Sequence, residues 1–164
     1  MGRVATRGVP QSRDEWLLRA VRYLARFDRT ASQVEGFLLG RGATPAQARQ
    51  TIRRLADLRY LDDHAYASRW IEHRLARYPV GRERLKLELL AKGLPDAVAD
   101  EAIREALRDV DEETLARRAV RFKRRSGGRL PPRQLVALLR QRGFEEDTIE
   151  RIMGDRTEIK GCDA

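Results

Sequence analysis

The chain has 164 residues, of which 41% are hydrophobic and 36% charged, so it can bury a core while keeping a polar surface. It has no apolar run of the about 18 residues that a membrane span needs, and its first residues lack the apolar core of a signal peptide, so we expect a cytoplasmic protein without membrane association. The net charge of +9 predicts attraction to a polyanion, and the single Cys162 excludes an internal disulfide.

The charge is distributed unevenly along the chain. Residues 1–61 carry 12 basic and 5 acidic side chains, a net charge of +7. Residues 62–111 carry 9 and 11, a net charge of −2, and residues 112–164 carry 13 and 9, a net charge of +4. The basic ends are therefore the segments that we expect to meet nucleic acid, although arginine-rich codon usage could also raise the charge.

The first predicted helix covers residues 13–26, because Ser12 and Glu15 can form a capping box ahead of an apolar face. Another helix covers residues 45–58, because a threonine cap, a first-turn proline and a glutamine three residues after the cap come together at its start. The side chains expected to face the core of this region are Leu17, Ala20, Val21, Leu24, Ala48, Ile52 and Leu55.

The next helix covers residues 63–77 and is capped by Asp62 or Asp63, since an aspartate at a helix start accepts backbone N–H groups. Residues 85–89 alternate in polarity like a strand, but the alternation is short and we predict a helix there. A helix over residues 96–108 follows. The side chains expected to face inward are Tyr66, Trp70, Ile71, Leu75, Ala99, Ala102, Ile103, Ala106 and Leu107.

The last predicted helices cover residues 112–125, 133–142 and 146–153. Two glycines and two prolines predict a loop over residues 126–132, which is the expected hinge of the molecule. Leu115, Ala119 and Phe122 mark the inner face of the first of these helices.

Three glycines reveal an internal repeat of about fifty residues. Gly42, Gly93 and Gly143 are 51 and 50 positions apart, and each follows a basic residue. A leucine precedes each glycine by four positions and an apolar residue follows it, which is typical of a helix that ends on a left-handed residue. The leucine and apolar partners are Leu38 with Ala43, Leu89 with Leu94, and Leu139 with Phe144.

The sequence therefore predicts an all-α fold of three tandem three-helix repeats, each a longer helix followed by two shorter ones. The predicted repeats cover residues 13–61, 62–111 and 112–154, with flexible termini at residues 1–12 and 155–164. Because units of this size bury little surface alone, we expect them to stack into an elongated, curved helical array.

No pattern of catalytic residues is evident in the sequence. His64 and His73 do not have the spacing of the two-histidine zinc motif, and the chain has no phosphate-binding glycine loop. The Asp62-Asp63 pair could bind a metal ion, but a pair at a helix start is typical of a cap. We therefore expect neither an enzyme nor a cofactor.

Basic side chains gather in three clusters, one in each predicted repeat. Each cluster indicates either a binding site for a polyanion or an ordinary solvated helix face. Trp70, Tyr66 and Phe122 could stack on bases, but Trp70 and Phe122 also have core spacing. The clusters are Arg19, Arg22, Arg26 and Arg29; Arg82, Arg84, Lys86 and Lys92; and Arg117, Arg118, Arg121, Lys123, Arg124 and Arg125.

Residues 60–70 contain two aspartates, Asp62 and Asp63, followed by Tyr66 and Trp70. This stretch resembles the central signature of the RecX family, and the resemblance to that family covers residues 14–154. The stretch from Gly81 to Leu89 with Lys92-Gly93 resembles its second block, and Arg142-Gly143-Phe144 resembles the end of its third repeat. The long glycine- and proline-rich loop after Phe122 and the tail from Asp155 depart from the family pattern.

The resemblance implies a negative modulator of RecA that lies in the groove of the RecA–DNA filament. Such a protein limits filament extension, ATP hydrolysis and strand exchange without chemistry of its own, and acts in DNA recombination, DNA repair and the SOS response. The implied partners are the RecA filament and single- and double-stranded DNA, and we expect a monomer. Two alternatives stay open: a sequence-nonspecific nucleic-acid-binding protein without a RecA partner, and a helical adaptor whose charge is incidental.

Overall fold

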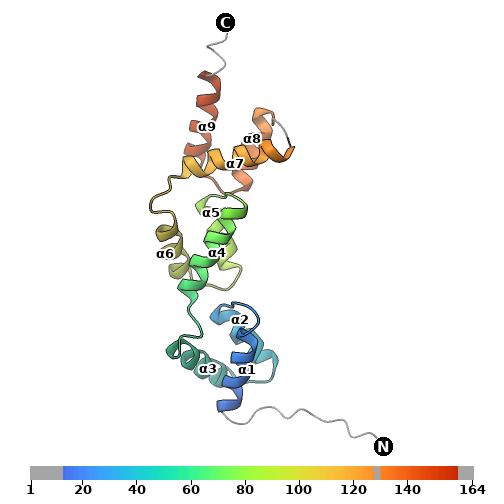
Figure 1. The fold of residues 1–164 in the computed structure, drawn as a ribbon, viewed down its shortest axis with the longest axis vertical. Coiled ribbons are helices and arrows are strands. Elements are labelled where there is room, and N and C mark those ends of the chain that lie inside the picture. The colour runs from blue at the N-terminus through green and yellow to red at the C-terminus, as the bar shows by residue number, and fades with distance from the viewer. Residues whose placement is uncertain (1–12, 128–129, 159–164) are drawn as a thin grey trace, which may run out of the picture. The chain divides into compact units, whose positions relative to one another are not determined.

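The computed structural model describes residues 13–127 and 130–158, and within these ranges every regular element is a helix (Figure 1). The all-α prediction is therefore confirmed, including a helix where residues 85–89 alternate in polarity. None of the described helices is long and apolar enough to cross a membrane. In chain order the helices are α1 (Arg13–Leu24), α2 (Ala31–Gly40), α3 (Pro45–Asp57), α4 (Asp63–Arg77), α5 (Arg82–Leu90), α6 (Asp96–Ala106), α7 (Glu112–Gly127), α8 (Pro132–Gln141) and α9 (Glu146–Glu158).

The three repeated glycines adopt the left-handed conformation that their sequence context predicts. Their φ angles are 93° at Gly42, 80° at Gly93 and 73° at Gly143. After α2, the N–H of Ala43 donates to the carbonyl of Leu38 at 3.1 Å, and Phe144 after α8 makes the equivalent bond at 3.2 Å. These bonds satisfy carbonyls at the helix ends, and the apolar residue after each glycine is buried.

The chain divides into two compact units. The first extends to Tyr66 and also contains Lys92–Leu94, and the second contains Ala67–Ala91 and the chain from Pro95 onward. In the first unit, α1, α2 and α3 pack against one another around a core that includes Trp16, Leu38 and Leu55. In the second unit, α5 packs on α6, and α7, α8 and α9 pack against one another. The three-repeat boundaries stay a prediction.

A turn from later in the chain lies against the start of α2 within the first unit. Thr30 caps α2 through a capping box with Gln33, and its hydroxyl also donates to the carbonyl of Lys92 at 2.8 Å. A Cβ on Gly93 would lie 2.4 Å from Oγ of Ser32, so glycine is required there by close packing as well as by its φ.

The second unit contains the same joint between the α8–α9 turn and the start of α5. The N–H of Gly81 donates to the carbonyl of Arg142 at 2.9 Å. A Cβ on Gly143 would lie 2.4 Å from the backbone nitrogen of Arg84, so this glycine too is fixed by a close approach. Gly81 lies 51 positions after Thr30, and Arg142 lies 50 positions after Lys92, so the joint recurs with the repeat spacing.

Several helix lengths differ from the prediction. In the first predicted repeat, the first helix was expected to be the longest, but α1 has 12 residues and α3 has 13. Helix α7 continues to Gly127, two residues past the predicted end, and in its last turn the hydroxyl of Ser126 donates to the carbonyl of Phe122 at 3.2 Å. Helix α9 continues past the predicted end to Glu158.

Three expected features fall wholly or partly outside the described residues. The predicted helix cap at Ser12 lies outside the described residues, and so does Cys162. The same holds for residues 1–12 and 159–164 of the predicted flexible termini. The predicted hinge loop is described only in part, since residues 128–129 are not included.

The fully buried tryptophan is Trp16 and not Trp70, which the helix periodicity placed inward. Trp16, which the sequence analysis did not place in the core, is 1% exposed, whereas Trp70 is half-buried. Leu17, Val21 and Leu24 are half-buried around Trp16. These three side chains pack against the core as expected, and the prediction missed Trp16, whose large indole lies at the centre of that core. Ala106 was also expected to face inward and is exposed.

Candidate nucleic-acid interface

The Asp62-Asp63 pair connects α4 with α2. Asp62 accepts the N–H of Ala65 at 2.8 Å and so caps its own helix. Asp63 instead accepts the N–H of Ala31 at 2.8 Å, in the first turn of α2. Burial raises the pKa of Asp63, and the hydrogen bond from Ala31 opposes this rise only in part. Both aspartates therefore have a structural role in the joint of the first unit.

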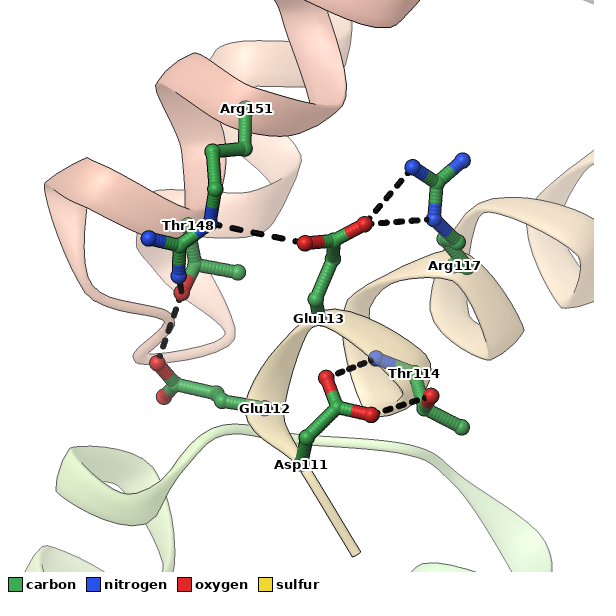
Figure 2. Close-up of polar contacts among 7 residues, drawn as sticks. All are labelled: Asp111, Glu112, Glu113, Thr114, Arg117, Thr148 and Arg151. Carbon is green, nitrogen blue, oxygen red and sulfur yellow. Dashed lines mark hydrogen bonds and ion pairs between the residues drawn. The ribbon is translucent and has the colours of Figure 1, made fainter.

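A second acidic pair at the start of α7, which the sequence analysis did not single out, has the same arrangement (Figure 2). Asp111 accepts the N–H of Thr114 at 2.9 Å and caps α7. Glu112 accepts the hydroxyl of Thr148, in α9, at 3.0 Å. Burial raises the pKa of Glu112, and among the groups that oppose this rise is the backbone of Arg82 at the start of α5. The pair lies 49 positions after Asp62-Asp63, a spacing that could have revealed it from the sequence.

The first arginine of the α7 cluster is held by an intramolecular ion pair. Nη2 of Arg117 lies 2.7 Å from a carboxylate oxygen of Glu113, and the other oxygen of Glu113 lies 3.4 Å from Nε of Arg151 (Figure 2). Because Glu113 bridges α7 and α9, Arg117 belongs to the packing of these helices. It is a weaker candidate for phosphate binding than the residues that follow it.

Four further arginines of α7 face solvent. Arg118, Arg121, Arg124 and Arg125 are exposed, and none of them makes an ion pair with residues 14–127 or 130–154, the ranges whose side chains the structure describes. Positions 118, 121 and 125 have the spacing of one helix face, opposite a buried face that includes Leu115 and Ala119. We call these four residues the α7 arginine row. Lys123, the remaining member of the predicted cluster, is half-buried.

The cluster on α5 differs from the α7 arginine row, because the carboxylate of Glu88 lies between Arg84 of this cluster and Arg74 of α4. Nε of Arg84 lies 2.7 Å from one oxygen of Glu88, and Nε of Arg74 lies 2.8 Å from the other. Arg74 first, and then Arg84, lower the pKa of Glu88, so this glutamate stays ionised.

Lys86, also on α5, is balanced by two aspartates of α6. Its ammonium lies 2.9 Å from Asp100 and 3.2 Å from Asp96, and these carboxylates raise the pKa of Lys86. The other two members of the cluster, Arg82 and Lys92, are half-buried and have backbone atoms in the two joints. Two of the four cations of the α5 cluster, Arg84 and Lys86, are therefore already paired with carboxylates within the molecule.

The cluster on α1 is less exposed than the α7 arginine row, but among the described residues it is not paired with carboxylates in the way that the α5 cluster is. Arg22 and Arg26 are exposed, whereas the guanidinium of Arg19 lies over the Trp16 ring at 5.6 Å from its centroid. Two exposed cations therefore remain at the end of this helix and in the turn that follows it.

The aromatic residues singled out from the sequence do not present open ring faces. Tyr66 is 8% exposed, and Trp70 is half-buried. Phe122 is half-buried with its ring centroid 4.7 Å from that of Tyr78. These residues therefore contribute to packing. In the part of the chain that the structure describes, no three histidine, cysteine or acidic residues are grouped so that they could hold a metal ion.

Known proteins match most of this chain. The model of the second three-helix domain of RecX matches residues 62–103. The regulatory protein RecX of Treponema pallidum is 32% identical over 139 residues, which cover 85% of this chain and 84% of that protein. The regulatory protein RecX of Thermus thermophilus is 36% identical over 130 residues, which cover 79% of this chain and 84% of that protein.

The fold agrees with these sequence matches. The crystal structure of RecX from Lactobacillus salivarius superimposes with a TM-score of 0.73 at 22% sequence identity, covering 87% of this chain and 95% of that one. The sequence matches extend well beyond the central aspartate signature, over most of the described helices. The chain therefore belongs to the RecX family of regulatory proteins.

Proposed function

We propose that this protein is a negative modulator of RecA that binds in the groove of the RecA–DNA filament and limits filament extension, ATP hydrolysis and strand exchange. The observation that carries the proposal is the α7 arginine row in a chain that matches RecX regulatory proteins over 85% of its length. The row offers exposed cations that have no carboxylate partner among the side chains that the structure describes, and such cations can contact a DNA backbone.

The proposed mechanism needs no chemical step by the protein. Arginines of α7, with Arg22 and Arg26, neutralise phosphates of the filament DNA, and condensed counterions are released. The remaining helix faces contact RecA, so that binding is shared between DNA and protein. Several weak contacts on one chain give avidity, which allows a small protein to hold a repeating partner. We expect the protein to act as a monomer in the cytoplasm and to bind both single- and double-stranded DNA.

Titration of the protein into RecA and single-stranded DNA, with ATP hydrolysis as the readout, tests the proposal. We expect inhibition at fewer copies than RecA protomers, because one bound molecule can stop a growing filament. Inhibition that begins only when the protein is sufficient to cover all the DNA would contradict the proposal and favour a nonspecific DNA-binding protein. An adaptor would leave ATP hydrolysis unchanged, and its partner contact would persist in high salt, where phosphate contacts weaken.

A further inference from the structure

An unusual stack of aromatic and arginine side chains connects α1 with α2 in the first unit. The rings of Tyr23 and Phe37 lie parallel, with centroids 4.1 Å apart and an interplanar angle of 3°. Arg41 lies 4.8 Å from the Phe37 centroid. Arg29 lies 5.2 Å from the Tyr23 centroid and 5.3 Å from that of Phe27. We call these five residues the α1–α2 stack.

Phe27 is the exposed end of this stack. It is 66% exposed, more than any other large apolar side chain that the structure describes. Its segment is anchored, because Thr30, three residues later, is fully buried and caps α2. The Arg29 guanidinium supports the ring through a cation–π contact. Phe27 is therefore an apolar ring held at the surface by packed neighbours.

The surroundings of Phe27 are positively charged. Arg22 and Arg26 are exposed beside it in the chain, and Arg29 and Arg41 belong to the stack itself. The acidic residues Asp28 and Glu35 offset two of these four charges, which leaves a net positive surface. An aromatic face next to several arginines is complementary to a ligand that has flat rings and phosphates.

We propose that Phe27 is a stacking platform for an unpaired nucleobase, with Arg22 and Arg26 on the adjacent phosphates, so that this surface binds single-stranded nucleic acid. The inference rests on the proposed DNA contact and adds a site and a strand preference to it. In a duplex both faces of each base are covered by neighbouring bases, whereas a single strand can turn one base onto an exposed ring. An acidic peptide would satisfy the arginines but would leave the phenyl face without a partner.

Fluorescence anisotropy with two labelled oligonucleotides of equal length, oligo(dT) and a strand of abasic sites, tests the inference with the full chain and without RecA. We expect Phe27→Ala to weaken oligo(dT) binding at least about fivefold, since loss of one stacked base has an effect of this size. Binding to the abasic strand should not change, because its phosphates are intact. Phe27→Trp should keep the affinity and show fluorescence quenching when oligo(dT) binds.

Tyr60→Ala is the matched control, because Tyr60 is also exposed, at 56%, but lies outside the stack. It should leave both affinities unchanged. Equal losses on the two strands for Phe27→Ala, or no loss on oligo(dT), would overturn the inference. Unchanged oligo(dT) affinity with loss of RecA inhibition would show that Phe27 contacts protein instead. Normal oligo(dT) discrimination in a protein that does not inhibit RecA would contradict the proposed function and leave this site in place.

Discussion

Helices α5 and α7 both carry clusters of basic side chains, but their surroundings differ. On α5, Arg84 shares Glu88 with Arg74, and Lys86 lies within 3.2 Å of both Asp96 and Asp100. On α7, four arginines face solvent and make no ion pair with any side chain within residues 14–127 and 130–154.

The difference shows that counting basic residues does not measure how much positive charge a partner can reach, because some of these residues are already paired with carboxylates. A phosphate can recruit Lys86 only by displacing carboxylates that are already in place, so most of the electrostatic gain is cancelled. An arginine of the α7 row exchanges only water and loosely associated ions for the phosphate. The net charges of the two segments agree with this picture, at −2 for residues 62–111 and +4 for residues 112–164.

The largest expected effect is the loss of DNA binding when the α7 row is removed. We expect Arg121→Ala with Arg124→Ala and Arg125→Ala to weaken single-stranded DNA binding about 10²-fold in 0.1 M salt and to reduce the salt-dependence slope by about 2. Removal of three exposed arginines from α3, by Arg49→Ala with Arg53→Ala and Arg54→Ala, is the control for net charge. An equal loss in this control, measured by anisotropy against salt concentration, would show that the location of the charges on α7 does not matter.

A smaller gain of affinity is expected when the α5 cluster is released from its carboxylates. Asp96→Asn with Asp100→Asn frees Lys86 for a phosphate, and we expect DNA affinity to rise about fivefold in 0.1 M salt. Asp57→Asn with Asp109→Asn changes the net charge equally at exposed positions elsewhere. If the two double variants bind DNA equally well, the ion pairs on Lys86 do not limit binding.

Loss of the shared carboxylate on α5 should lower stability. We expect Glu88→Gln to lower the free energy of unfolding by about 1 kcal/mol at pH 7, because three charge-assisted hydrogen bonds are weakened at a partly exposed site. The pKa of Glu88 is lowered in the folded state, so its contribution is present above its ordinary value of 4.5 and is lost as pH falls through the folded value. Urea unfolding should therefore show the difference between parent and variant shrinking below about pH 4.5. A constant difference down to pH 3 would contradict the ion-pair explanation.

The smallest effect is expected at the glutamate that begins α7. The pKa of Glu112 is raised by burial, so its contribution to stability is present below its ordinary value of 4.5 and is lost as pH rises through the folded value. Glu112→Gln keeps an acceptor for the Thr148 hydroxyl without the charge. We expect thermal unfolding at pH 7 to show a stability equal to the parent or higher by a few tenths of a kcal/mol. A clear loss of stability at pH 7 would mean that the ionised carboxylate is required.

Much of the backbone was predictable from the sequence, because helix ends are decided by neighbouring residues. Gly42, Gly93 and Gly143 end their helices with positive φ, since glycine has no Cβ to oppose that conformation. Asp62 caps α4 and Thr44 caps α3 through bonds that reach only three residues along the chain. These interactions depend on spacing alone, so a pattern of residue types is sufficient to locate them.

The tertiary structure alone decided which of the basic and aromatic side chains are available to a partner. Lys86 is balanced by Asp100, 14 residues away, and Asp63 bonds to Ala31, 32 residues away, so no local pattern identifies these pairs. Periodicity placed Trp70 inward, but Trp16 is the tryptophan that occupies the core, and Phe27 is the most exposed of the described aromatic side chains. The physical reason is that burial and ion pairing depend on which helix faces meet: α6 brings two carboxylates to Lys86 of α5, whereas four arginines of α7 are exposed to solvent.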